Sequence, residues 1–114
     1  MPNPVVHWEI QCKDAKKAQQ FYSRLFGWHV DANNPMNYGM VDTRDEVGIN
    51  GGIGPCDGPN RVTFYIQVAD LQAFLDKATR LGGKVVMPPT EIPDTVTLAM
   101  FADPEGNVIG LVKG

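Results

Sequence analysis

The chain of 114 residues lacks three features that would each indicate a particular class of protein. It has no apolar run of about 18 residues, the length that indicates a transmembrane helix, and its first residues do not have the pattern of a signal peptide. It has no basic excess, because 10 lysines and arginines are outnumbered by 13 acidic residues and the net charge is -3. This charge argues against nucleic acid or an anionic membrane as a partner. We therefore expect a cytoplasmic protein.

Cysteine is also scarce, with Cys12 in an alternating segment and Cys56 in a loop rich in glycine and proline. Two cysteines in such unlike settings do not indicate a structural disulfide in a reducing compartment. Cys12 falls on the apolar face of its segment, which is typical of a small buried residue. The length suits a single domain with a modest core, in which a partner subunit would add stability.

An internal repeat is the most informative feature that the sequence does contain. Residues Trp8–Val30 align without a gap with Phe64–Val86 at a constant offset of 56, with seven identities in 23 positions. About one or two identities are expected by chance. A fixed period indicates one structural unit used twice, and we place the copies at about 5–54 and 61–113 within one domain, 1–114.

Each copy predicts the order β-α-β-β-β. It opens with alternation typical of a half-buried strand, and then an aspartate (Asp14 or Asp70) begins a helix that a glycine (Gly27 or Gly83) ends. Strands are expected at 28–30, 38–42 and 48–53 in the first copy and at 84–87, 95–102 and 107–112 in the second, with Pro88, Pro89 and Pro93 in a turn. The helical residues expected in the core are Ala15, Ala18, Tyr22 and Leu25, and Leu71, Phe74, Ala78 and Leu81, together with the aromatic residues Phe21, Phe26 and Phe64.

These features together resemble the vicinal-oxygen-chelate superfamily of glyoxalases, bleomycin-resistance proteins and ring-cleaving dioxygenases. The resemblance rests on the duplication, on His7 at the start of the first strand, and on two motifs, and it covers 7–112. The motifs are FYSRLFGW at 21–28 and FADPEGNVIGL at 101–111. The resemblance implies an α+β fold in which two tandem βαβββ units form cupped, barrel-like mixed sheets.

The resemblance also implies a ligand cavity and a homodimer. Single-domain relatives usually pair, and a half-closed sheet leaves an edge to be covered. Even-numbered residues of the two first strands (Trp8, Ile10, Cys12, Phe64, Ile66 and Val68) are expected under the helices. The residues expected to line the cavity are His7, Glu9, Gln11, Thr63, Tyr65 and Gln67, with Gly52 and Gly110 widening it.

Metal-dependent members of the superfamily hold their ion with one residue near the start of each first strand and one in each last strand, usually His and Glu. Here those positions carry His7, Thr63, Gly52 and Gly110, with the register of Gly52 uncertain by about one residue. A divalent ion needs three or four converging donors, and glycine supplies none from a side chain. We expect no cofactor and no tightly held metal, and a differently recruited divalent metal is the alternative.

His7 and Glu9 are the best candidates for chemistry, and the sequence leaves their roles open. His7 is either a hydrogen-bonded cavity residue, an acid/base group facing the ligand, or a metal ligand. Glu9 either pairs with a neighbour or contacts ligand, because a lone buried carboxylate is costly. The favoured function is binding of a small organic molecule. The alternative is a lyase, isomerase or dioxygenase-like enzyme that acts through His7 and Glu9 or through a recruited metal.

Overall fold

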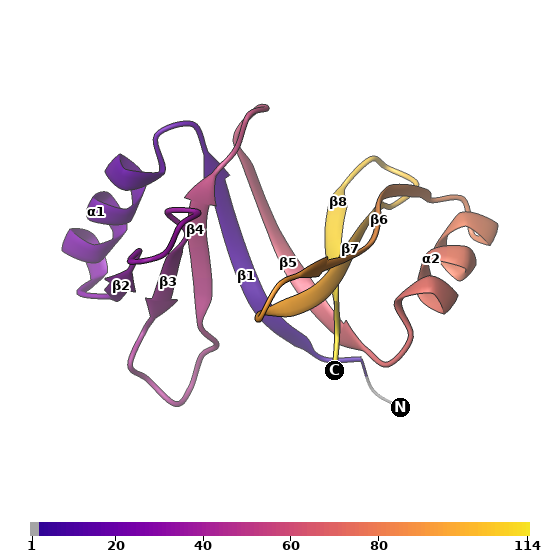
Figure 1. Cartoon of the computed structure of the whole chain (residues 1–114), viewed down its shortest axis with the longest axis horizontal. Helices are drawn as coiled ribbons and strands as arrows, with labels where there is room; N and C mark the ends of the chain where they lie inside the picture. Colours follow the sequence, from indigo (N-terminus) through magenta and orange to yellow (C-terminus); the bar gives the residue numbers. More distant parts are fainter. Residues whose placement is uncertain (1–2) are drawn as a thin grey trace. The chain divides into compact units, whose positions relative to one another are not determined.

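The computed structural model describes residues 3–114 and contains the βαβββ unit twice (Figure 1). It divides into two compact units, His7–Thr63, here called the N-unit, and 3–6 with Phe64–Gly114, here called the C-unit. No helix in the described part of the chain is long and apolar enough to cross a membrane. The first copy comprises β1 (Val5–Cys12), α1 (Ala15–Phe26), β2 (His29–Asp31), β3 (Gly39–Asp42) and β4 (Gly51–Pro55), and the second comprises β5 (Arg61–Val68), α2 (Leu71–Arg80), β6 (Lys84–Ile92), β7 (Val96–Ala102) and β8 (Val108–Lys113).

Each copy forms a mixed four-stranded arrangement with the same topology. The strand order is β2-β3-β4-β1 in the first copy and β5-β8-β7-β6 in the second. The first and last strands of each copy are parallel, whereas the other neighbours are antiparallel. The predicted α+β class and βαβββ order are therefore confirmed. The register also settles the position of Gly52, which pairs with Glu9, as Gly110 pairs with Tyr65.

Both helices begin at the predicted aspartates. The Asp14 side chain accepts a hydrogen bond from the backbone N–H of Lys17, and that of Asp70 accepts one from Ala73, each at 3.1 Å. Such caps satisfy amide groups that lack partners in the first turn. Gly27 ends α1 in the left-handed conformation, with φ of 73°.

The glycine prediction is off by one residue at the end of α2. Gly82, with φ of 103°, adopts the left-handed conformation there, and not Gly83. Gly83 instead lies so close to the carbonyl oxygen of Ala102 that a β-carbon would stand only 2.6 Å from it. Close packing of helix end and strand therefore keeps this second glycine small.

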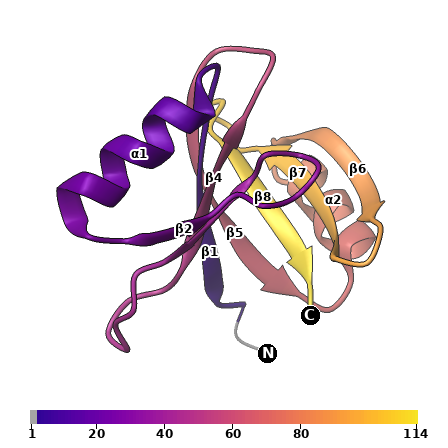
Figure 2. The ribbon, with the colours of Figure 1, turned by 60° about the vertical axis from the view of Figure 1, so that its left-hand side comes forward.

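The N-unit core forms where α1 lies against its sheet (Figure 2). Cys12, Val41 and Ile53 are buried at its centre. Even-numbered residues of β1 pack on this cluster together with aromatic and aliphatic side chains from α1 and the segment after it: Trp8, Ile10, Ala18, Tyr22, Trp28 and Val30. Burial raises the pKa of the Cys12 thiol, and both cysteines are free. The even-numbered face of β1 thus lies under the helix as predicted.

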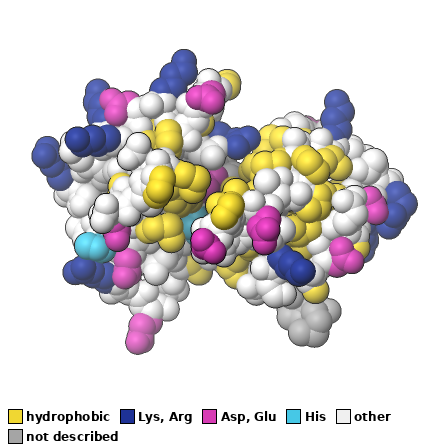
Figure 3. Space-filling model, in the orientation of Figure 1, with side chains coloured by type: hydrophobic (Ala, Val, Ile, Leu, Met, Phe, Trp, Pro, Cys, Tyr) yellow, Lys and Arg dark blue, Asp and Glu magenta, His cyan; other side chains and the backbone are white. Residues whose placement is uncertain are grey.

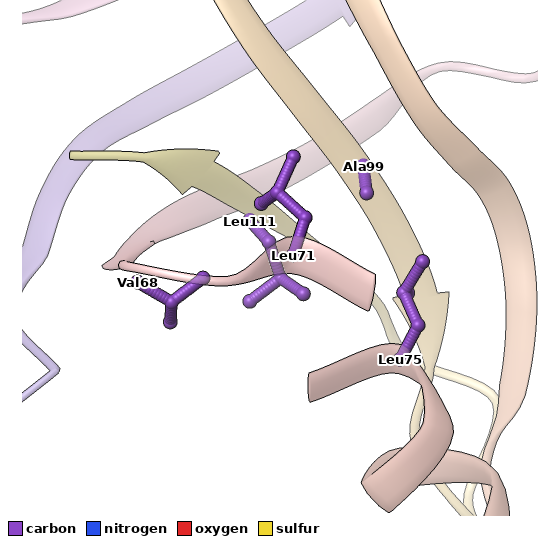
Figure 4. Packing of buried hydrophobic residues seen from close by; sticks show 5 residues of the cluster. All are labelled: Val68, Leu71, Leu75, Ala99 and Leu111. Carbon is purple, nitrogen blue, oxygen red and sulfur yellow. The ribbon is translucent and has the colours of Figure 1, made fainter. Parts of the chain in front are cut away.

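The C-unit core has the same plan with smaller side chains. Leu71 and Leu75 of α2 point toward Val68, Ala99 and Leu111 on the strands (Figure 4). Ile66, Phe74 and Phe101 pack against this cluster and are partly buried. Ile66 and Val68 therefore lie on the helix side, as predicted. Phe64 does not follow them into the core and is 38% exposed.

The predicted helical stripes are wrong at their C-terminal ends. Leu25 and Leu81 are exposed, as are the aromatic residues Phe21 and Phe26 of α1. Apart from Ala15, the buried residue of α1 is Gln19, whose side-chain amide donates to the carbonyl oxygens of Ile53 (2.7 Å) and Asn37 (3.2 Å). The helix therefore buries a polar side chain because neighbouring backbone groups pair with it.

The prolines predicted in a turn lie largely within a strand. β6 continues through Pro88 and Pro89, and its pairing with β7 shifts register between Val85 and Thr90. Proline lacks an N–H for the ladder, so such shifts are expected around it. Valine side chains of β6 and β7 stay exposed, and hydrophobic groups gather over these strands in Figure 3.

Leu75 and Leu81 offer a direct test of which leucines of the second copy support the core. Leu75 is 1% exposed and Leu81 is 70% exposed. We expect Leu75→Ala to lower the free energy of unfolding by about 2–5 kcal/mol, because it removes buried methyl groups and leaves a cavity. Leu81→Ala should change it by less than about 0.5 kcal/mol. Urea denaturation measures both, and equal losses would contradict the observed packing.

Candidate functional site

A hydrogen-bonded cluster of three residues lies on the odd-numbered face of β1 in the N-unit. The Tyr38 hydroxyl donates to Glu9 Oε2 at 2.9 Å, and His7 Nε2 lies 2.8 Å from the same hydroxyl. A phenol has a single hydrogen, which here goes to Glu9, so Nε2 of His7 carries the hydrogen of the second bond. Glu9 is 6% exposed. The structure therefore joins the two predicted chemical candidates through a tyrosine.

Tyr38 is held in place by a turn and by two glycines. The Asn34 side chain accepts from the Tyr38 N–H at 3.0 Å and donates to the Tyr38 carbonyl oxygen at 2.7 Å. The Tyr38 ring lies against β4 at Gly52 and Gly54, where any β-carbon would overlap it or press against it. The glycines expected to widen a cavity thus make room for an aromatic ring.

The imidazole of His7 is kept neutral near physiological pH. Desolvation by burial lowers its pKa below the ordinary value of 6.5, and the nearby Glu9 carboxylate opposes this only in part. A neutral imidazole can accept a proton, and Tyr38 connects it to a carboxylate. This arrangement can hold a polar ligand group or transfer a proton.

Gln11 continues the same face of β1 and binds a residue that the sequence analysis missed. Nη2 of Arg61 donates to Oε1 of Gln11 at 2.6 Å. Arg61 and Tyr38 lie 50 and 31 residues from Gln11 and His7 along the chain. The only sequence signal for Tyr38 is the spacing of Gly52 and Gly54, which leaves room for one ring on alternate residues of a strand.

The remaining predicted residues occupy separate environments. Thr63 and Tyr65 are buried, and the Tyr65 ring covers Gly110, its partner across the strands. Gln67 is exposed, and its side chain lies beside the C-terminal Gly114. Because Tyr65 is only 7% exposed, it contributes to packing as well as being a candidate ligand contact.

The residues at the four metal positions do not fit a tight divalent site. A glutamate at position 52 would overlap the Tyr38 ring, and one at position 110 would overlap the Tyr65 ring. Among the described residues, no three His, Cys, Asp or Glu side chains group as metal ligands do. His7 Nε2, a natural ligand atom, is hydrogen-bonded to Tyr38. We derive no chemistry through a metal at these positions.

The lowered pKa of His7 predicts a pH-dependent stability. Below about pH 6.5 the unfolded chain takes up a proton that the folded protein resists, so the free energy of unfolding falls as the pH decreases through this range. We expect His7→Gln to flatten the dependence between about pH 6.5 and 5. His29→Gln is the matched control, because His29 is exposed and should leave the dependence unchanged. Urea denaturation at several pH values checks this, and equal slopes in wild type and His7→Gln would contradict it.

Comparisons with known proteins agree with this architecture. The family model of the Glyoxalase/Bleomycin resistance protein/Dioxygenase superfamily matches residues 5–111. A protein of Mycobacterium bovis and Mycobacterium tuberculosis named "Putative glyoxylase CFP32" is 32% identical over 112 residues. The match covers 90% of this chain and 42% of the relative, so the chain spans less than half the length of these curated relatives.

Solved structures share the fold at low sequence identity. Methylmalonyl-CoA epimerase from Mycobacterium tuberculosis is 15% identical with a TM-score of 0.66, over 96% of this chain and 86% of that one. The Mn(II)-bound glyoxalase from Novosphingobium aromaticivorans is 16% identical with a TM-score of 0.67, over 98% of this chain and 40% of that one. Sequence, fold and family model agree over nearly the whole length, and the chain belongs to the Glyoxalase/Bleomycin resistance protein/Dioxygenase superfamily.

Proposed function

We propose that this chain binds a small organic molecule without the help of a tightly held metal. The observation that carries the proposal is Tyr38, whose ring packs on Gly52 and whose hydroxyl binds both His7 and Glu9. The position that would supply a carboxylate in a metal-dependent relative is thus covered by an aromatic ring. Polar groups on the odd-numbered face of the first strands then recognise the ligand directly.

The proposed ligand-facing set is the one expected from the sequence, with Tyr38 and Arg61 added. The guanidinium group of Arg61 supplies donors, and the carboxylate of Glu9, which Tyr38 links to His7, supplies an acceptor. Such a set suits a ligand with carbonyl or hydroxyl oxygens. The proposed residues of the N-unit are His7, Glu9, Gln11, Tyr38, Gly52, Arg61 and Thr63, and those of the C-unit are Tyr65, Gln67 and Gly110. A cytoplasmic homodimer belongs to the same proposal.

A second candidate is an enzyme of the isomerase or lyase type that acts by proton transfer. The chain of hydrogen bonds from His7 through Tyr38 to Glu9 favours it. In this mechanism the neutral imidazole takes a proton from carbon next to a substrate carbonyl, and the carboxylate stabilises the imidazolium through the tyrosine. Loss of turnover in His7→Gln with retained ligand binding would distinguish catalysis from binding alone.

The binding proposal is tested by thermal shift on protein treated with chelator and dialysed. Zn²⁺, Ni²⁺, Mn²⁺ and Fe²⁺ should each change the melting temperature little. A metabolite or antibiotic that binds should raise stability by about 2.7 kcal/mol at 100 times its dissociation constant. That shift should be lost in Glu9→Gln and His7→Gln and kept in His29→Gln. Stoichiometric metal retained through dialysis, or a shift that survives both site substitutions, would contradict the proposal.

The packing of Tyr38 on Gly52 can be tested separately by a double-mutant cycle. Gly52→Glu alone should destabilise the protein strongly, because the new side chain overlaps the ring. Tyr38→Ala removes the ring, so adding Gly52→Glu to it should cost far less than in wild type. The double variant should also gain affinity for Mn²⁺ in calorimetry, since it adds a carboxylate near His7. Additive losses of stability would show that the two positions do not share this space.

A further inference from the structure

The C-unit has a cavity between α2 and the helix-facing side of its strands. It has a volume of about 380 Å³ and is lined mainly by apolar side chains. Phe74, Ala78 and Leu81 line it from the helix and its end, and Ile66 and Phe101 line it from β5 and β7. These strand residues belong to the face opposite Tyr65 and Gly110. The cavity is therefore distinct from the proposed ligand-facing set.

The internal repeat explains why this space is open in only one copy. At the offset of 56, Ala78 corresponds to Tyr22 and Lys84 corresponds to Trp28. In the N-unit the rings of Tyr22 and Trp28 stack with centroids 6.1 Å apart and planes 11° apart, and both pack on the core. Two aromatic rings thus fill the groove between helix and sheet in the N-unit. The C-unit has an alanine and an exposed lysine at the same positions.

The size and walls of the cavity suit an aromatic ligand. An apolar cavity of about 150 Å³ binds benzene, and small-molecule sites usually measure about 300–1,000 Å³. The cavity here can hold two fused rings, and in the N-unit the corresponding place holds the phenol ring of Tyr22 and the indole of Trp28. Phe74 and Phe101 on its two walls can make offset or edge contacts with such rings.

Lys77 is the charged group of the cavity lining that can bind an anion. Lys77 lines the cavity and is exposed. Asp103 also lines it, but its carboxylate accepts hydrogen bonds from the Asn107 side chain and from the backbone of Glu105 and Asn107, each at 2.9 Å. These bonds, chiefly that of the Asn107 side chain, lower the pKa of Asp103. The Asp103 carboxylate therefore stabilises the turn that contains it, whereas the exposed ammonium group of Lys77 can contact a ligand.

We propose that this cavity binds an aromatic monocarboxylate of about two fused rings, with the rings between α2 and the strands and the carboxylate at Lys77. The rings take the place that Tyr22 and Trp28 occupy in the N-unit. The lysine stem covers part of the ring surface while its ammonium group stays in water at the mouth. This site is independent of the function proposed for the odd-numbered face of the first strands.

Isothermal titration of the full chain with 2-naphthoate tests the proposal. Wild type should bind it, and Ala78→Tyr should weaken binding at least tenfold because the new ring fills the cavity as Tyr22 does in the N-unit. Ala73→Tyr is the matched control, since Ala73 is exposed on the same helix and binding should be unchanged. Absence of binding to wild type, or equal binding by Ala78→Tyr at an unchanged melting temperature, would overturn the proposal.

The role of Lys77 is tested by removing its charge and comparing a charged ligand with a neutral one. Lys77→Met keeps most of the aliphatic side chain but removes the charge. It should weaken the binding of 2-naphthoate severalfold and leave the binding of neutral 2-naphthol unchanged. Arg80→Met removes the same charge from the same turn of α2 at a residue outside the cavity lining, and it should leave both affinities unchanged. Equal weakening by the two substitutions would show a general charge effect and would overturn the assignment of Lys77.

Discussion

The packing of a tyrosine ring on a glycine of the last strand is the constraint that shapes the odd-numbered face of each copy. Tyr38 covers Gly52 in the N-unit, and Tyr65 covers Gly110 in the C-unit. The two tyrosines come from different places, one from a turn before β3 and one from β5 itself. A strand without a side chain lets a flat ring lie on its backbone, and the ring then fills the space from which a longer residue would reach a metal. The lack of a side-chain donor at positions 52 and 110 and the presence of aromatic rings over them therefore belong to one packing arrangement.

Duplication has left two copies of one plan with different contents. On the odd-numbered face, the N-unit links an imidazole, a phenol and a carboxylate, whereas the C-unit buries Tyr65. On the helix-facing side the difference is reversed: aromatic rings fill the N-unit groove, whereas Ala78 leaves the C-unit groove open. Each copy therefore fills one side of its sheet more completely than the other: the helix-facing side in the N-unit and the odd-numbered face in the C-unit. The other side is free to differ, because a βαβββ unit needs only its core to remain packed.

Much of the fold follows from local patterns. The alternation around Ile10 and Ile66 defines which face of each strand lies under a helix, because side chains alternate with period two. The caps at Asp14 and Asp70 follow from unsatisfied amide groups that any helix has at its start. The helical stripes were less predictable at Leu25, because burial at a helix end depends on where the sheet stops. Gln19 takes a buried place only because carbonyl groups distant in sequence accept its hydrogen bonds.

The sequence by itself determined the repeat and most of the strand faces, since these depend on residue type and spacing. It also identified His7 and Glu9 as the residues most suited to chemistry. Only the tertiary structure decided that Tyr38 joins them, that Arg61 binds Gln11, and that Ala78 leaves a cavity. Each of these is a contact between segments 29 to 50 residues apart or a difference in how completely a groove is filled. Such contacts depend on the three-dimensional placement of several segments at once, which no local pattern records.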